Sequence, residues 1–278
     1  MSDSLNTFYY RKIAYCYYKL KDGMHALLFY NKAYLTDSTN LENISSLAKI
    51  MIQASMYEDA EKICNRGIEV DSSNSEFYKL KADIKYAENH YYRAAPFYKK
   101  AIQMGDSSYI NCQRFGKVLC ETQDFENALI YNKAVYIADS SNHQNSFYLC
   151  KTYLGLKDFD NCLKYSEKTL KLLKFAKNYT FNICDIMAEA YAEQNNYSEA
   201  INMYNRKKEV FNTDHVTDNY KLALLYDKNR NLNNALSYYQ KVADYYKKHS
   251  TNSNENNILK YCEQRITHIL EELHFQGN

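Results

Sequence analysis

Apolar residues recur at helical spacing along this chain, and short polar breaks separate the runs. Around the break Gln194-Asn195-Asn196, Ala188 precedes Tyr191 by three residues, and Tyr197 precedes Ala200 by three. Spacings of three and four place side chains on one face of a helix. The pattern therefore predicts two helices joined by a tight polar turn.

The small residue of the second helix returns in a fixed phase. It falls at Ala26, Ala60, Ala94, Ala128, Cys162, Ala200 and Ala235. The first four intervals are 34 residues, and the next two are 38 and 35. A second small residue stands twelve positions earlier each time, at Ala14, Ala48, Ala82, Gly116, Cys150, Ala188 and Ala223. Small side chains let two helices cross closely, so we predict seven helix pairs.

This helix–turn–helix unit of 34 residues resembles the tetratricopeptide repeat. The resemblance covers almost the whole chain and implies an all-α fold, a right-handed α-α superhelix of antiparallel helix pairs. We place seven repeats at about 7–40, 41–74, 75–108, 109–142, 143–176, 181–214 and 216–249. Residues 250–278 are expected to hold a C-terminal capping helix, about 254–273, because a solenoid otherwise exposes a core face at its end. A dimer contact is the alternative role of this helix.

Polar tetrads mark three of the repeat boundaries: Asp37-Ser38-Thr39-Asn40, Asp71-Ser72-Ser73-Asn74 and Asp139-Ser140-Ser141-Asn142. Three residue pairs fit a capping box, namely Thr39 with Glu42, Ser73 with Glu76 and Ser141 with Gln144. We therefore expect helices to start near residues 40, 74 and 142. The four extra residues before repeat six follow a Leu-rich run, so we expect a longer second helix in repeat five.

Composition narrows the classes of function. The chain has 35 basic and 33 acidic residues, a net charge of +2, which gives no general attraction to nucleic acid or to an anionic membrane. No apolar run is long enough to insert into a membrane, and the first residues do not resemble a signal peptide. We expect a soluble protein.

Two alternatives stay open for the compartment, the cytoplasm or export from a longer precursor. Eight cysteines without an evident pairing pattern favour a reducing compartment. The Asn-, Lys- and Tyr-rich composition, however, resembles repeat proteins of Bacteroidetes-type bacteria, many of which are exported.

The residues that carry chemistry form no recognisable site. The cysteines are Cys16, Cys64, Cys112, Cys120, Cys150, Cys162, Cys184 and Cys262, and none forms Cys-x-x-Cys or a Cys–His pair with zinc spacing. No phosphate-binding loop, nucleophile elbow or His-Glu-x-x-His is present. We expect no enzyme, no metal and no cofactor.

The resemblance implies a concave wall built from the first helix of each repeat, where peptides bind. The positions that match it are Arg11, Tyr15 and Tyr18; Ser45, Lys49 and Ile52; Lys79, Asp83 and Tyr86; Gln113 and Lys117; Phe147, Lys151 and Leu154; Asp185, Glu189 and Glu193; and Tyr220, Leu224 and Asp227. The clamp that holds chaperone tails in this family needs Lys and Asn residues that are absent here. We therefore expect no chaperone tail to bind.

This set is net basic in repeats one to five and acidic in repeats six and seven. We expect an acidic segment to cross Lys117 and Lys151, with an apolar side chain on Phe147. Asp185 and Glu189 should repel that segment. A solvated face without a ligand is the alternative for the basic row.

The sequence thus predicts a non-catalytic scaffold for protein–protein interaction that takes a peptide or protein segment in its groove. The alternatives are a peptide-sensing module of a larger signalling protein and a self-associating structural repeat protein. We expect a monomer or a weak homodimer, with a protein or peptide partner and no nucleic acid.

Overall fold

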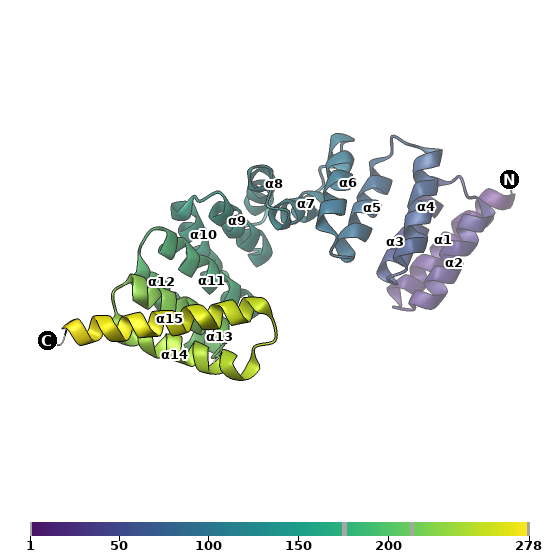
Figure 1. The fold of residues 1–278 in the computed structure, drawn as a ribbon. Helices are drawn as coiled ribbons and strands as arrows, with labels where there is room; N and C mark the ends of the chain where they lie inside the picture. Colours follow the sequence, from purple (N-terminus) through teal and green to yellow (C-terminus); the bar gives the residue numbers. More distant parts are fainter. Residues whose placement is uncertain (1, 174–176, 212–213, 277–278) are drawn as a thin grey trace. The chain divides into compact units, whose positions relative to one another are not determined.

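The computed structural model describes residues 2–173, 177–211 and 214–276, and every regular element within these ranges is an α-helix (Figure 1). The chain forms two compact units, residues 1–139 and 140–278. The first unit contains α1 (Ser2–Lys19), α2 (Gly23–Thr36), α3 (Leu41–Gln53), α4 (Tyr57–Val70), α5 (Ser75–Ala87), α6 (Tyr91–Gln103), α7 (Tyr109–Glu121) and α8 (Phe125–Ala138). The second contains α9 (His143–Gly155), α10 (Phe159–Leu172), α11 (Lys177–Glu193), α12 (Tyr197–Phe211), α13 (Val216–Lys228), α14 (Leu232–His249) and α15 (Ser253–Gln276). The all-α fold expected from the sequence is confirmed.

Consecutive helices pack as pairs, from α1 with α2 to α13 with α14. We call the first helix of each pair the A-helix and the second the B-helix. Each B-helix also packs on the next A-helix of its own unit, and A-helices touch each other at α1–α3, α3–α5 and α9–α11. A-helices therefore lie side by side from α1 to α5 and from α9 to α11, and the A-helix face is the face that the sequence analysis singled out for binding.

The small residues lie where the two helices of a pair cross, and all fourteen are buried. Repeat four shows how strict the fit is. A side chain at Gly116 would overlap the Asn132 amide, which donates a hydrogen bond to the Gly116 carbonyl at 3.3 Å. Asn132 stands where other repeats carry a buried tyrosine, so the missing aromatic ring and the glycine compensate for each other.

Buried tyrosines fill the same crossings in other repeats. Tyr98 and Tyr239 are fully buried, and their hydroxyls donate to Asp83 (2.6 Å) and Asp227 (3.2 Å) on the paired A-helix. Burial is the main reason why the pKa of both phenols is raised. Each hydroxyl is therefore a permanent donor that fixes a carboxylate of the A-helix face.

Each A-helix ends in a left-handed residue. These residues are Lys21, Ser55, Asn89, Gln123, Lys157, Asn195 and Arg230, with φ between 58° and 62°. In the first turn, Asp22 N donates to Tyr17 O (2.9 Å) and Lys21 N donates to Tyr18 O (3.0 Å). These two bonds form a Schellman motif, and the same turn recurs in every described pair.

The capping boxes predicted from the sequence are wrong, although the helices begin within one residue of the expected positions. The caps are Asn40, Asn74 and Asn142, whose side chains accept from the backbone N–H two residues later. Thr39 instead donates its hydroxyl to Asp37, at 2.8 Å. Because Asp37 forms a tight turn with Thr39, the residue at the N-cap position is Asn40.

The longer helix expected in repeat five lies instead in repeat six. The B-helix α10 has 14 residues, like α4 and α8, whereas α11 has 17 against 13 in the other A-helices from α3 onward. Those shorter A-helices begin seven residues before their small residue, a position that Phe181 holds in α11. Phe181 packs edge-on against Phe211 of α12, with ring centroids 5.3 Å apart, and so anchors the added turn.

The last helix, α15, packs along α14 and covers the end of the second unit (Figure 1). Cys262 and Ile269 are fully buried there, in one cluster with Ala235, Tyr239 and Val242 of α14. The helix is longer than the sequence suggested, since it begins at Ser253 and continues to Gln276.

Candidate functional site

The A-helix face of the first unit carries a groove rich in tyrosine. The tyrosine groove, as we call it, has a volume of about 300 Å³ and is lined by Tyr15, Tyr18, Tyr30, Ser46, Lys49, Ile50 and Gln53. A second hollow of about 320 Å³ adjoins it through Lys49 and Gln53 and reaches Asp83, Tyr86 and Arg114. Tyr15, Tyr18 and Lys49 were expected here from the sequence, whereas Tyr30 reaches the groove from a B-helix.

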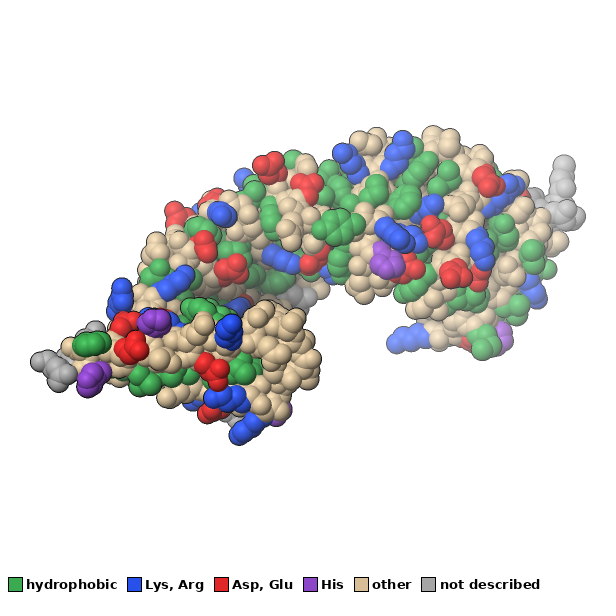
Figure 2. All heavy atoms as spheres, viewed as in Figure 1, with side chains coloured by type: hydrophobic (Ala, Val, Ile, Leu, Met, Phe, Trp, Pro, Cys, Tyr) green, Lys and Arg blue, Asp and Glu red, His purple; other side chains and the backbone are tan. Residues whose placement is uncertain are grey.

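The cations of this face are held by carboxylates. Arg11 pairs with Glu42 and donates to the Asn40 side chain at 3.2 Å. Lys49 pairs with Glu76 at 2.8 Å. Lys79 lies 3.5 Å from Glu76 and 3.7 Å from Asp106. The positive charge expected at these three residues is therefore cancelled locally. Figure 2 shows basic and acidic side chains interspersed on the surface that it presents.

Arg114 was not expected at the site, and it completes a three-part contact. Its guanidinium lies 2.6 Å from the Asp83 carboxylate, which also accepts the Tyr98 hydroxyl. The contact joins α5, α6 and α7. The partner lies 31 residues away along the chain, so no local pattern in the sequence revealed the pair.

The remaining predicted residues of the first unit lie on α7. Gln113 donates to the Tyr109 hydroxyl at 3.4 Å. The Lys117 ammonium lies 4.6 Å from the centre of the Tyr86 ring, in a cation–π contact. Tyr86 also lines the hollow that adjoins the tyrosine groove, so Lys117 lies beside that hollow.

In the second unit, Phe147 and Lys151 are half-buried on α9, and Phe147 meets Tyr148 edge-on with centroids 5.2 Å apart. Asp185 lies on α11, and both its carboxylate oxygens accept from Lys207, at 2.8 and 3.0 Å. The negative charge expected of Asp185 is therefore neutralised. Lys151 belongs to the second unit and Lys117 to the first.

Lys207 is a residue that the sequence reasoning missed. Its side chain is 2% exposed, and it also donates to Asp218 at 2.9 Å and stands 3.6 Å from the centre of the Phe181 ring. The equivalent B-helix positions hold Ala33, Gly67, Ala101, Val135, Thr169 and Val242, all buried. A lysine at a position that is uncharged in the other repeats was the feature of the sequence that could have revealed this contact. A buried lysine needs a carboxylate partner.

A second groove lies on α11, α12 and α13. The lysine groove, as we call it, has a volume of about 530 Å³ and is lined by Ala188, Glu189, Ala192, Tyr204, Lys221, Leu224, Leu225 and Lys228. Its floor continues into the core cluster around Ala188, Tyr204 and Leu225. Glu189 and Leu224 were expected on this face, whereas both lysines were not.

The charges of the lysine groove are exposed and unpaired within the described part of the chain. Lys221 lies 5.6 Å from the centre of the Tyr204 ring, and Lys228 lies 5.7 Å from that of Tyr197. Among the residues described, neither lysine nor Glu189 forms an ion pair. One wall therefore carries two available cations, and the other carries one available carboxylate.

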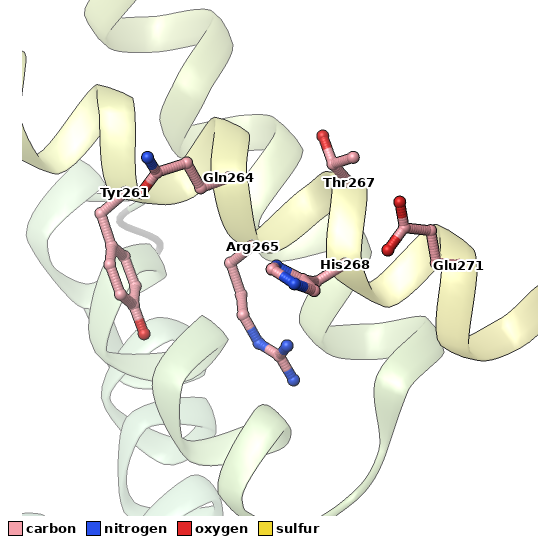
Figure 3. Close-up of a pocket in the computed structure, with 6 residues that line it drawn as sticks. All are labelled: Tyr261, Gln264, Arg265, Thr267, His268 and Glu271. Carbon is pink, nitrogen blue, oxygen red and sulfur yellow. The ribbon is translucent and has the colours of Figure 1, made fainter.

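Tyr220, the last predicted residue, packs toward α15 and meets Tyr261 edge-on at 6.4 Å. A hollow of about 530 Å³ on α15 is lined by Tyr261, Gln264, Arg265, Thr267, His268 and Glu271. In Figure 3, Tyr261 and Arg265 project from α15 toward the helices beneath it. Arg265 binds both oxygens of Asp227 at 2.6 and 2.8 Å, so its charge serves the packing of α15 on α13.

No cluster of three or more His, Cys, Asp or Glu side chains among the described residues has the arrangement of a metal site. None of the helices described is both long and apolar enough to cross a membrane.

Solved structures share this fold, although no protein-family model matches the sequence. YrrB, a TPR protein with an unusual peptide-binding site, is 16% identical, with 65% of this chain and 91% of YrrB covered and a TM-score of 0.59. MamA is 18% identical, with 62% and 93% covered and a TM-score of 0.53. A tetratricopeptide repeat protein from Parabacteroides merdae is 10% identical, with 93% and 99% covered and a TM-score of 0.57. The chain therefore has the fold of the tetratricopeptide repeat proteins, as the resemblance implied.

Proposed function

We propose that this chain is a non-catalytic interaction scaffold that binds an extended peptide segment on the A-helix faces of its two units. The observation that carries the proposal is the pair of grooves on those faces, with volumes of about 300 and 530 Å³. Both are lined by aromatic or aliphatic side chains with a few polar groups at the edge, which is the usual make-up of a binding groove.

The exposed tyrosines support the same function. Tyr15 and Tyr18 are 48% and 39% exposed in the tyrosine groove. Tyrosine offers a large contact area at a small cost in side-chain entropy, and its hydroxyl bonds to a peptide backbone. YrrB, which shares the fold, is described as having a peptide-binding site, and this likeness supports the proposal without assigning the ligand.

Selection from a displayed library of random peptides tests this function without a known partner. The full chain is the bait, and each selected peptide is measured again against Tyr15→Ser with Tyr18→Ser, and against Leu224→Ser. Tyr92→Ser is the matched control, because Tyr92 is 74% exposed on the B-helix α6. We expect most selected peptides to lose affinity with an A-helix variant and to keep it with the control.

Peptides that bind equally well to all the variants would contradict the proposal. The same holds if repeated selection enriches no peptide at all. Circular dichroism of each variant confirms that it keeps its helices, so that a lost affinity is not a lost fold.

A further inference from the structure

The lysine groove has a chemistry that selects one kind of segment, and this inference rests on the proposed function. We propose that it binds an extended segment of a partner protein in which a large apolar side chain lies between two carboxylates, in the pattern acid–x–apolar–x–acid. The two carboxylates contact Lys221 and Lys228, and the apolar side chain enters the hollow between them.

The spacing follows from the helix that carries the lysines. Lys221 and Lys228 are seven residues apart on α13, which is roughly 10 Å along the helix axis. In an extended segment, residues i, i+2 and i+4 face the same side, and i and i+4 are about 13 Å apart. Two flexible lysine side chains cover that difference, so acids at i and i+4 are the pair that reaches both lysines.

The apolar position follows from the floor of the groove. Leu224 and Leu225 lie on α13 between the two lysines, and they face Ala188 and Ala192 of α11. The two alanines leave the hollow that larger side chains would fill, and Tyr204 closes its base at 4% exposure. A leucine-sized side chain at position i+2 would bury its surface there.

The charges on the opposite wall fix how the segment lies. Glu189 on α11 is exposed and forms no ion pair among the described residues, so it disfavours a carboxylate on that side. Asp185, one turn earlier, is neutralised by Lys207 and repels less than its sequence suggests. The acids of the ligand therefore point toward α13, and the segment runs along that helix.

This arrangement reverses the charge preference inferred from the sequence, which made the sixth repeat repel acidic segments. That inference used the acids of α11 alone. It could not include Lys207, which cancels Asp185 from the adjacent B-helix, or the two lysines that α13 contributes to the same groove.

A fluorescent peptide tests the proposal by polarisation titration against the full chain. The probe is Gly-Ser-Glu-Ser-Leu-Ser-Glu-Ser-Gly. One control peptide carries glutamine for both glutamates, and another carries serine for the leucine. We expect each control peptide to bind about tenfold more weakly than the probe, because one loses both ion pairs and the other loses the buried apolar side chain. The preference over the glutamine peptide should shrink as salt rises.

Two protein variants locate the contact. Lys221→Gln with Lys228→Gln should lose the preference for the glutamate peptide. The control variant, Lys241→Gln with Lys260→Gln, changes the net charge by the same amount at exposed lysines of the same unit that lie outside the groove. It should keep the preference for the glutamate peptide. An equal loss in both variants would show general charge attraction and overturn the proposal.

The remaining outcomes separate this inference from the proposed function. If the library selects peptides that depend on the A-helix faces but lack the acidic pattern, and the probe does not bind, the function stands and the inference is wrong. If the groove holds a second copy of the chain, sedimentation will show a dimer that Lys221→Gln with Lys228→Gln dissociates, and the inference is again wrong.

Discussion

In the first unit, Arg11, Lys49 and Arg114 each lie against a carboxylate, whereas Lys221 and Lys228 of the second unit lie against aromatic rings. Three carboxylates of the second unit form ion pairs with other cations. Asp185 and Asp218 surround the buried Lys207, and Asp227 binds Arg265. The same repeat therefore produces a neutral, tyrosine-rich face in one unit and a face with available cations in the other.

The comparison shows that counting charges along an A-helix does not describe its surface. An exposed ion pair contributes only about 0–1 kcal/mol to stability, but it removes a cation from the set that a ligand can use. A buried cation likewise makes its carboxylate partners unavailable to a ligand. The charge that each groove presents is thus decided by the partners that neighbouring helices supply.

The largest expected effect tests the buried cation. Lys207→Ala leaves Asp218 buried without its partner, and we expect the free energy of unfolding to fall by about 3–5 kcal/mol. Adding Asp218→Asn should recover a large part of the loss, because the first unit pairs Ala33 with Asn43 at the same positions, with the Asn43 amide donating to the Ala33 carbonyl at 3.0 Å.

Urea unfolding of the two single variants and the double variant measures this coupling. Lys79→Ala in the first unit is the control, because its ion pairs are partly exposed, and it should cost less than about 1 kcal/mol. Equal losses for Lys207→Ala and Lys79→Ala would mean that the buried lysine contributes nothing beyond a surface pair.

A smaller effect is expected at the carboxylate that holds α15. The hydrogen bonds and charge of Arg265 keep the pKa of Asp227 below its usual value of 3.8, against the opposing effect of burial. A carboxylate with a lowered pKa in the folded state stabilises the protein above that usual value, and the contribution is lost as the pH falls through the folded-state pKa. Asp227→Asn should cost about 1.5–3 kcal/mol at pH 7.

Unfolding measured from pH 7 to pH 2 checks the sign. The difference in free energy of unfolding between the unaltered protein and the Asp227→Asn variant should become smaller below about pH 4. In the first unit, the Glu76 pKa is also lowered, since Lys49 and Lys79 together outweigh the burial that would raise it. Glu76→Gln should show the same narrowing, and a constant difference across the range would contradict the assignment in either unit.

The helix crossings should respond alike in both units. Ala60→Leu in the first unit and Ala200→Leu in the second each add a side chain at a fully buried crossing. We expect losses of about 1–3 kcal/mol from overpacking. Lys117→Leu, on the A-helix face, should change stability by less than about 0.5 kcal/mol. If the three variants behave alike under urea, the assignment of small residues to the crossings is wrong.

The smallest effect concerns the left-handed turns, which the two units share. Gln123→Gly and Lys157→Gly remove the penalty of a left-handed side chain, offset in part by the greater freedom of glycine in the unfolded chain. We expect each to stabilise its unit by about 0.5 kcal/mol. Asn195→Gly is the matched control, because asparagine tolerates this conformation, and its gain should be smaller in the same thermal melts.

The sequence by itself was sufficient for the helix pairs and their small crossings. Ala26, Ala60 and Ala94 recur at one interval because each repeat needs a close helix crossing at the same place. The residues of a single repeat are therefore enough to show this requirement. The tetrad at residues 37–40 likewise located a helix start, although not the residue that caps it, since Thr39 and Asn40 both fit a cap and only the backbone decides between them.

The tertiary structure alone decided the charges of the binding faces. Lys207 meets Asp185 across 22 residues and Asp218 across 11, and Arg265 meets Asp227 across 38. These contacts join different helices, and whether they form depends on the rotation of each helix and on how deeply each side chain is buried. Electrostatic interactions act through space, so the repeat period placed Asp185 and Glu189 on the same A-helix face but could not show which of the two charges is cancelled.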